Sequence, residues 1–353
     1  MSIETHHTVE SLDGEWDALA ARTGATPFAR PGWIAAWYAA FGRGKPVVRI
    51  VREDGALAAV AALEARGDSL HSATNWHTPA YDVVAETAGA ARALADSVLA
   101  LRPRRLELRF LDREGLALPA FRAAATAAGY RVLTRRLMES PYVPVTGNWE
   151  EYAGTLRKLL KELGRRRRRL EETGRLSFSV EKGGDGLESA LEVGFRLEQS
   201  GWKGRRGTAI ASCPETRAFY SNIARWAAER DWLRLAFLSV DGRPIAFEFD
   251  LEVDDVLYNL KPGYDEAFGR FAPGKLLCEQ RIRNTFDAGM RSYEFLGAPL
   301  PFKLEWTSHV RERFILQAFV PTVPGLVELA AFRFGRPAAQ RAKGAYGRLR
   351  GRT

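Results

Sequence analysis

The sequence contains little cysteine and no long apolar run. Its two cysteines, Cys213 and Cys278, are too few for a disulfide framework and are typical of a reducing compartment. No apolar stretch approaches the roughly 20 residues that a membrane-spanning helix needs. The polar, acidic start MSIETHHTVESLDGEW is not typical of a signal peptide. We therefore expect a cytoplasmic protein, with peripheral contact at the inner face of the cell membrane as an addition.

Several catalytic signatures are also missing. The sequence has no Gly-x-Ser-x-Gly elbow, no Walker phosphate loop and no Rossmann glycine pattern. Cys278 has no partner base in the pattern, so we expect a buried structural thiol. No metal-ligand spacing connects the histidines, which predicts no metal site; they are His6, His7, His71, His77 and His309.

What the sequence does have is length and positive charge. A chain of 353 residues predicts two domains of ordinary size. The net charge of +9 favours anionic partners, and basic residues gather at Arg165–Arg169 and from Arg333 to Arg352. No aromatic residues interleave with the first run, which argues against nucleic acid. Three interpretations of these basic residues remain: contact with an anionic membrane, contact with a phosphorylated substrate, or a solvated helix face without a partner.

The most informative stretch is residues 235–277. It reads as strand, Asp-Gly turn, strand, strand, and then a loop of glycines and basic residues that leads into a helix. Val256, Tyr258 and Leu260 alternate with their neighbours at strand spacing, and helical spacing begins at Lys275. The first N–H groups of a helix are unpaired, so a strand that ends in such a loop predicts an anion site.

The segments VREDGALAAVAALE and LSVDGRPIAFEFDL look like one hairpin used twice, each with an Asp-Gly turn. Each is followed by a helix, a strand, a further element and a strand. We predict an α/β (α+β) fold of two related units, each a mixed twisted sheet flanked by helices. The predicted parts are an N-terminal segment with one short helix (1–27), a first domain (28–145), a second domain (146–322) and a basic tail (323–353). Within the tail we expect a short helix at Leu326–Phe334 and mobility from Arg336 to Thr353. One long basic helix is expected at Trp149–Glu172, and an irregular stretch at residues 64–88.

Four short features recur in a known family. They are Gly263-Tyr264-Asp265, the helix entry Pro273-Gly274, Gly289 before the strand Ser292–Leu296, and Lys303 with Trp306. With these features, residues 28–320 resemble the GNAT-like acyltransferases of the cellulose-biosynthesis-associated type, relatives of the Fem peptidyltransferases and of bacterial ceramide synthase-like N-acyltransferases. The resemblance implies two tandem GNAT-like domains. The usual phosphate loop, Gln/Arg-x-x-Gly-x-Gly/Ala, is replaced here by GRFAPG at residues 269–274.

The resemblance and the loop together predict a cofactor site. The backbone N–H groups and basic side chains of the loop would hold the pyrophosphate of an acyl-CoA. The alternative is an ordinary strand-to-helix turn with solvated basic residues. The cofactor-binding candidates are Lys261, Gly269, Arg270, Phe271, Pro273, Gly274 and Lys275.

Three side chains are candidates for the chemistry. Glu248 is the candidate general base, because attack on a thioester needs a neutral amine and burial raises a carboxyl pKa towards a useful range. The alternative places Glu248 and Asp250 on a half-exposed strand face. Tyr264 is the candidate acid for the leaving thiolate, and Asp265 the group that orients the incoming ammonium. The alternative for these two is a turn that Asp265 caps.

A further set of residues is predicted to bind the acceptor, because the family lines its acceptor cleft at matching positions. The alternatives are an exposed basic loop after a helix end for the first three residues, and a strand-edge pair for the last two. The candidates are Glu198, Trp202, Lys203, Lys303 and Trp306.

The favoured function is an acyl-CoA-dependent N-acyltransferase that acts on an amine of a cell-envelope substrate, such as an amino sugar, a polysaccharide or a sphingoid-type lipid. One alternative is a Fem-like transferase that takes its acyl group from aminoacyl-tRNA, which the net charge of +9 permits. The other is a non-catalytic binding module with the same fold.

Overall fold

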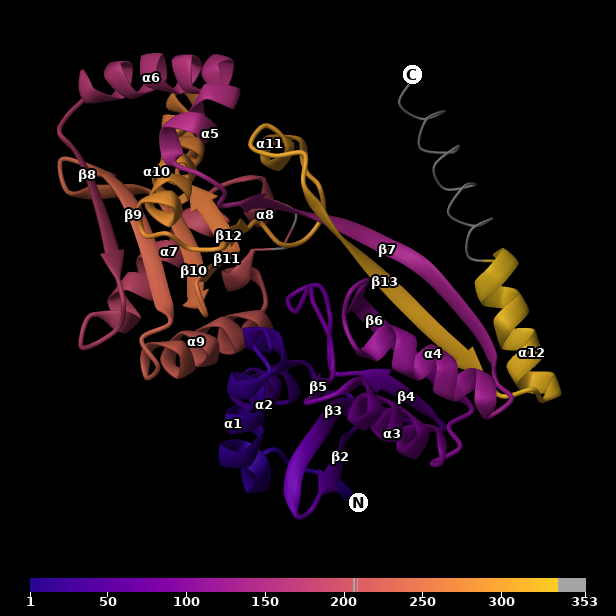
Figure 1. The fold of residues 1–353 in the computed structure, drawn as a ribbon. Coiled ribbons are helices and arrows are strands. Elements are labelled where there is room, and N and C mark those ends of the chain that lie inside the picture. Colours follow the sequence, from indigo (N-terminus) through magenta and orange to yellow (C-terminus); the bar gives the residue numbers. More distant parts are fainter. Residues whose placement is uncertain (206, 208, 336–353) are drawn as a thin grey trace. The chain divides into compact units, whose positions relative to one another are not determined.

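The computed structural model describes residues 1–205, 207 and 209–335, without the side chains of 202, 203, 334 and 335. The chain divides into two compact units. Unit 1 comprises residues 1–34, 42–137 and 312–353, and unit 2 comprises residues 35–41 and 138–311. Helix α2 (Pro31–Phe41) and strands β7 (Arg131–Pro144) and β13 (Val310–Phe319) each contribute to both units. The predicted α/β class, with mixed sheets and flanking helices, is confirmed (Figure 1).

Unit 1 has the strand order β1-β2-β3-β4-β6-β13, with β7 next to β13 and β5 beside β3. Only β4 and β6 pair in parallel among the register pairs of this unit's described residues. The predicted Asp-Gly hairpin joins β2 and β3, and both turn residues, Asp54 and Gly55, have positive φ angles as a tight hairpin turn requires. Its strands and helices are β1 (Ser2–His6), α1 (Asp13–Arg22), β2 (Lys45–Glu53), β3 (Ala56–Arg66), β4 (Ser69–Ser72), β5 (Val84–Ala85), α3 (Ala88–Leu99), β6 (Arg105–Asp112), α4 (Ala117–Ala127) and α12 (Val323–Ala330).

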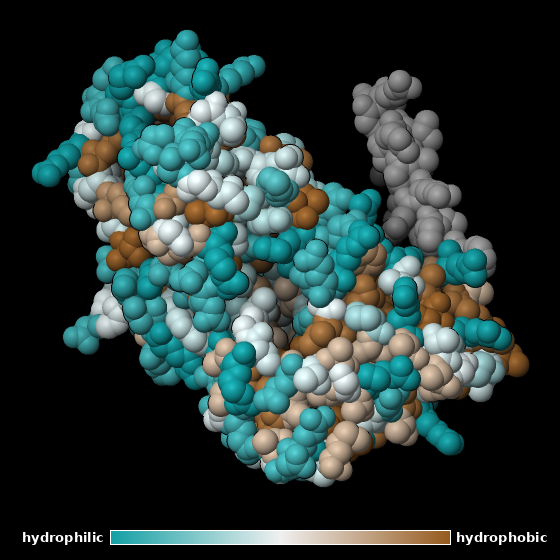
Figure 2. All heavy atoms as spheres, viewed as in Figure 1, coloured by the Kyte–Doolittle hydropathy of each residue, from teal (hydrophilic) through white to brown (hydrophobic). Residues whose placement is uncertain are grey.

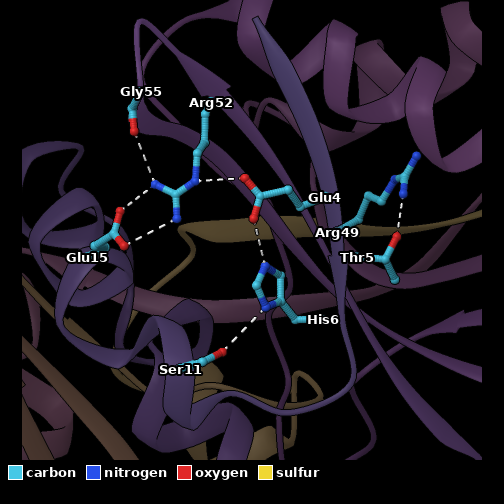
Figure 3. A network of polar contacts seen from close by, with 8 residues as sticks. All are labelled: Glu4, Thr5, His6, Ser11, Glu15, Arg49, Arg52 and Gly55. Carbon is cyan, nitrogen blue, oxygen red and sulfur yellow. Dashed lines mark hydrogen bonds and ion pairs between the residues drawn. The ribbon is translucent and has the colours of Figure 1, made fainter.

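A surface network holds the edge strand β1 to its neighbours (Figure 3). The Arg52 guanidinium donates to Glu4 on β1 at 3.0 Å and to Glu15 on α1 at 2.5 Å. It also donates to the carbonyl of Gly55 at 3.3 Å. Arg52 thereby links β1, α1 and the hairpin turn at a position where all the carboxylates remain partly exposed.

Unit 2 has the strand order β7-β12-β11-β10-β9-β8, in which only β11 and β12 pair in parallel within the described residues. Phe247 and Phe249 of β10 face α7 and α9, whereas Ala246, Glu248 and Asp250 face α10. Both faces of this sheet are therefore covered. The elements are α5 (Trp149–Thr155), α6 (Arg157–Glu171), β8 (Leu176–Glu181), α7 (Leu187–Gln199), α8 (Trp202–Arg205), α9 (Pro214–Ala228), β9 (Leu233–Val240), β10 (Arg243–Val253), β11 (Val256–Tyr264), α10 (Pro273–Asp287), β12 (Ser292–Glu294) and α11 (Pro301–Leu304).

The structure departs from the expected elements at several points. The predicted helix Trp149–Glu172 is broken at Leu156, whose φ and ψ of −109° and 19° are not helical, so α5 and α6 are separate. The stretch 64–88, expected to be irregular, contains β4 and β5. The first 27 residues hold the strand β1 besides a helix. The predicted mobility of the tail concerns residues 336–353, which lie outside the described residues.

The two units repeat one order of elements. In each, an Asp-Gly hairpin is followed by a strand, a helix and a second strand parallel to the first: β2-β3, β4, α3 and β6 in unit 1, and β9-β10, β11, α10 and β12 in unit 2. In each unit the second of these parallel strands also pairs with an antiparallel strand. That strand is β13 beside β6 in unit 1 and β7 beside β12 in unit 2. The helices α3 and α10 thus occupy matching places.

Candidate active site

The two parallel strands of unit 2 separate next to the N-terminus of α10. They pair only from Val256 to Tyr258 on β11 and from Ser292 to Glu294 on β12. Strand β11 then continues to Tyr264 with β10 as its one partner strand among the described residues. The register with β10 shifts at Leu260, which opposes no residue and forms a bulge. From Asn259 onward, this edge of β11 is therefore not covered by another strand.

The loop after β11 is more closed than the sequence predicts. It forms a 3-10 helix, η4 (Glu266–Phe271), and then Ala272, with a φ of 53°, begins α10. The Ala272 N–H bonds to the Gly269 carbonyl at 3.0 Å, and the Lys275 N–H bonds to the Ala272 carbonyl at 2.9 Å. Pro273 has no N–H to offer. Of the three N–H groups that remain at the start of α10, those of Ala272, Gly274 and Lys275, only the Gly274 N–H has no acceptor among the described residues.

The cations predicted to bind phosphate also have contacts within the protein. Lys275 forms an ion pair with Glu305 at 2.5 Å. The Arg270 guanidinium lies 4.6 Å from the centre of the Phe271 ring, and Phe271 itself is buried in the core of unit 2. The Lys261 ammonium lies 5.4 Å from the centre of the Tyr220 ring. These cations would have to leave or share their present contacts to hold a phosphate.

The side chains of Tyr264 and Asp265, at the end of β11, differ in their hydrogen bonds. Tyr264 is partly exposed, and a Cβ added to Gly274 would lie 3.3 Å from its ring. Its hydroxyl has no hydrogen bond among the described residues. The Asp265 carboxylate accepts from the Ala267 N–H at 3.0 Å and pairs with Arg243 at 2.7 Å. Asp265 therefore caps η4, which is the alternative that the sequence left open, and its role with an ammonium stays a prediction.

Glu248 lies in a buried polar network between β10 and α10, and not on a half-exposed face. It is 2% exposed and accepts a hydrogen bond from the Tyr293 hydroxyl at 3.1 Å. Beside it, Asp250 pairs with Arg281 at 2.9 Å and accepts from the Asn259 amide at 2.8 Å. Burial raises the pKa of Glu248 well above its ordinary value, and the nearby Asp250 charge adds to the rise. The role of Glu248 as a base stays a prediction.

The rest of this network was not found from the sequence. Arg281 and Tyr293 come from α10 and β12, so their meeting with Asp250 and Glu248 depends on the fold. One signal was available: Arg281 interrupts the apolar face that the spacing predicts for this helix. The expected buried thiol of Cys278 is confirmed; its sulfur lies 4.0 Å from the Tyr293 hydroxyl, and burial raises its pKa.

The residues predicted to bind the acceptor do not form one group. Glu198 is 1% exposed and accepts from the Ile210 N–H at 2.8 Å. It sits against β11, because a Cβ added to Gly263 would lie 2.5 Å from the Glu198 Cα. Trp202 and Lys203 begin the short helix α8, but their side chains are outside the described part of the chain.

The other two predicted acceptor residues, Lys303 and Trp306, are buried. The Lys303 ammonium donates to the carbonyls of Phe295 and Leu296, at 3.2 and 2.5 Å, and so fixes the chain after β12. Trp306 forms part of the wall of a pocket of about 580 Å³. The pocket is also lined by Glu151, Tyr152, Leu156, Leu304, Glu305 and His309, among others. Of the residues predicted to bind the acceptor, Trp306 is the one that lines this pocket.

Two further findings concern what the described residues lack. No helix among them is long and apolar enough to cross a membrane. In the same part of the chain, no group of three or more His, Cys, Asp or Glu side chains is arranged to hold a metal ion.

A comparison with protein families gives a match within the second unit. Residues 157–304 match the family described as Acetyltransferase (GNAT) domain. This match confirms the predicted enzyme class, an acyltransferase of the GNAT type. It includes β11, η4 and α10, so the separating strands belong to the matched domain. A comparison with curated protein sequences gives no match.

Solved structures share the fold over nearly the whole chain. FemX has a TM-score of 0.58 and 13% identity, covering 93% of this chain and 99% of its own. A C-terminal domain assigned to a lysylphosphatidylglycerol synthetase from Agrobacterium fabrum has a TM-score of 0.57 and 15% identity, covering 92% and 97%. The structure titled L-PGS from Bacillus licheniformis has a TM-score of 0.55 and 11% identity, covering 88% and 93%. At these identities the likeness shows the fold alone, and it includes a Fem-type protein as the sequence predicts.

Proposed function

We propose that unit 2 transfers an acyl group from a CoA thioester to a primary amine. The observation that carries the proposal is the separation of β11 from β12 beside the N-terminus of α10. An extended chain with amide groups, such as the pantetheine arm of CoA, can pair with a strand edge as an added strand does. Its pyrophosphate would then reach the Gly274 N–H, where the helix dipole favours an anion.

The chemistry follows from that placement. The amine nitrogen attacks the thioester carbonyl carbon, the new C–N bond forms, and the C–S bond then breaks. Backbone N–H groups at the uncovered edge of β11 would stabilise the oxyanion of the intermediate. Tyr264 would give a proton to the leaving thiolate. Glu248 is the candidate for the proton that the amine loses, directly or through the Tyr293 hydroxyl that it already binds.

The acceptor we propose is an amine of the cell envelope: an amino sugar, a polysaccharide or a sphingoid-type lipid. Support comes from the resemblance to the cellulose-biosynthesis-associated type and from the fold shared with FemX and a protein assigned as a lysylphosphatidylglycerol synthetase. The pocket next to Glu305 is the place proposed for part of this acceptor, because it lies beside Lys275 at the start of α10.

One observation favours a second donor, an aminoacyl-tRNA. The loop before α10 already uses the Ala272 and Lys275 amides, and Lys275 is paired with Glu305. A compact pyrophosphate site would need those groups, whereas a donor held along a larger basic surface would not. The fold shared with FemX fits this second candidate equally well.

Two measurements on the purified chain separate these proposals. The first is thermal stabilisation by CoA and, separately, by uncharged tRNA. The second is thiol release from acyl-CoAs of increasing chain length with glucosamine or sphinganine as acceptor. We expect CoA to raise the melting temperature and an amine to trigger thiol release. Stabilisation by tRNA and not by CoA would favour aminoacyl-tRNA as the donor. If neither compound stabilises the chain and no thiol is released, the chain is better described as a non-catalytic binding module.

A further inference from the structure

The helix α12 of unit 1 carries its apolar residues on the outside. Val323 is 76% exposed, Val327 64% and Leu326 44%, and Val323 is the most exposed large hydrophobic side chain of the described residues. Ala330 and Ala331 are exposed as well. These positions follow the spacing i, i+3, i+4, i+7 and i+8, which places them on one face of a helix. We call this set, Val323, Leu326, Val327, Ala330 and Ala331, the α12 face.

The opposite side of the helix attaches it to unit 1 through polar and aromatic groups. Glu328 forms an ion pair with Arg105 on β6. The Arg105 guanidinium lies 5.2 Å from the centre of the Phe332 ring, and Phe332 is buried against Phe319 of β13. An ordinary surface helix has the reverse arrangement, with its charged groups in water and its apolar groups inside. An exposed apolar face of this kind marks an interaction site.

The sequence that follows the helix is strongly basic. After Glu328 the chain contains no Asp or Glu, and its cations are Arg333, Arg336, Arg341, Lys343, Arg348, Arg350 and Arg352. These cations follow the apolar residues directly along the chain. A partner for both must therefore offer an apolar layer covered by negative charge.

We propose that the α12 face and the basic segment after it bind the surface of an anionic lipid bilayer. The apolar side chains would enter the boundary between headgroups and acyl chains, and the cations would lie among lipid phosphates. Figure 2 shows hydrophobic residues gathered over α12, whereas those over the basic helix α6 are mostly hydrophilic. Two cations of α6, Arg166 and Arg167, also pair with Glu162 and Glu279. Charge alone, as on α6, would suit a nucleic acid, but a nucleic acid offers no apolar layer to Val323 and Val327.

Flotation of the full chain with vesicles tests the proposal. Vesicles of phosphatidylcholine with phosphatidylglycerol should carry the protein at low salt, and vesicles of phosphatidylcholine alone should carry far less. The double variant Val323→Ser/Val327→Ser should bind the anionic vesicles roughly tenfold more weakly. Its matched control is Ile3→Ser/Leu101→Ser, which changes two other exposed apolar side chains of unit 1 and should bind as the unchanged chain does.

A second variant tests the charge. Arg348→Glu/Arg350→Glu/Arg352→Glu should abolish the preference for anionic over neutral vesicles while the apolar contribution remains. Unchanged flotation of Val323→Ser/Val327→Ser would overturn the proposal. So would self-association that this variant abolishes in the absence of vesicles, or binding of tRNA with no flotation. None of these outcomes depends on acyl transfer, so the surface and the proposed function succeed or fail separately.

Discussion

Helices α3 and α10 hold matching places in the two units, yet they bury very different side chains. The buried face of α3 is apolar apart from one serine, with Ala90, Leu94 and Val98 among its members. The face of α10 includes Arg281, which is 4% exposed and pairs with the fully buried Asp250. Glu248 and Tyr293 extend the same polar group. One topology is thus stable with either kind of interior.

This difference supports the proposal that unit 2 carries the chemistry. Removing charges from water costs free energy, and a buried ion pair is often no better for stability than apolar residues of the same volume. The buried face of α3 in unit 1 shows that a helix in this place does not need such a pair. Clusters of perturbed titratable groups occur preferentially at functional sites. The buried network of unit 2 therefore agrees with the acetyltransferase match, which lies in that unit.

The N-termini of α3 and α10 differ in whether a side chain caps them. Thr87 caps α3, since its hydroxyl oxygen accepts from the Ala90 N–H at 3.0 Å. The N-terminus of α10 has no side-chain cap and begins at Ala272, in a left-handed conformation. Both helices have a glycine at the second helical position, Gly89 and Gly274. The Thr87 side chain thus uses an N–H group at the start of α3, whereas at the start of α10 the Gly274 N–H is left for a ligand.

The largest expected effect comes from breaking the buried pair. Arg281→Met leaves Asp250 buried without its charge partner, which should lower the free energy of unfolding by about 3–5 kcal/mol. Arg52→Met, in the partly exposed network of unit 1, should lower it by about 1 kcal/mol or less. Urea denaturation of both variants measures the difference. If both variants lose the same free energy of unfolding, the buried pair of unit 2 contributes no more to stability than the surface network of unit 1.

The second effect is a pH dependence with a defined sign. The pKa of Glu248 is raised in the folded chain, so its contribution to stability is complete below the unfolded pKa and is lost as pH rises through the folded pKa. Glu248→Gln, which stays neutral, should remove a fall of up to about 1.4 kcal/mol per pH unit. Denaturation from pH 5 upward measures it.

Glu15 provides a matched control, because its pKa is shifted in the opposite direction. The hydrogen bond from Arg52 lowers the pKa of Glu15 in the surface network, so the contribution of Glu15 is lost as pH falls. Glu15→Gln should therefore remove a fall in stability on the acid side, and that fall should be smaller than the one that Glu248→Gln removes. If Glu248→Gln has the same pH profile as the unchanged chain, the pKa of Glu248 is not raised in the folded chain.

The sequence predicts the local part of this picture well. The two Asp-Gly hairpins follow from the turn residues themselves, and both are present. The alternation in β10 correctly separates Phe247 and Phe249 from Glu248. It could not show that the Glu248 face is buried, because the cover comes from α10, some thirty residues later in the chain. Similarly, the continuous leucine spacing of Trp149–Glu172 hides the break at Leu156.

The candidate site was harder to predict for the same reason. Glycines and cations between Tyr264 and Lys275 indicate an open loop, but the Asp265 cap and the left-handed Ala272 close most of it. Lys303 is placed by the carbonyls of Phe295 and Leu296, which no short pattern encodes. Residue types were thus informative about chemistry, while partners depended on contacts between distant segments.

The third prediction uses the two matched glycines. Gly274→Ala adds a Cβ 3.3 Å from the Tyr264 ring, beside the one donor at the start of α10 that remains without an acceptor in the described chain. It should weaken CoA binding about tenfold, which corresponds to about 1.4 kcal/mol. Gly89→Ala meets nothing closer than the Thr87 hydroxyl at 3.6 Å and should change neither binding nor folding. Calorimetric titration with CoA compares them, and undiminished affinity in Gly274→Ala would remove this amide from the site.

The smallest effects concern the two residues that begin the helices, and they should have opposite signs. Thr87→Ala removes the cap of α3 and should destabilise the chain by about 1 kcal/mol. Ala272→Gly should instead stabilise it by about 0.5 kcal/mol, because glycine adopts the φ of 53° without the strain that a Cβ brings. The gain is small because glycine also has more freedom to lose when the chain folds. Urea denaturation resolves both signs, and destabilisation by Ala272→Gly would show that the left-handed start of α10 is not strained. In that case strain does not prepare the uncapped N-terminus of α10 for a ligand, and only the CoA titration of Gly274→Ala tests the Gly274 N–H as a donor.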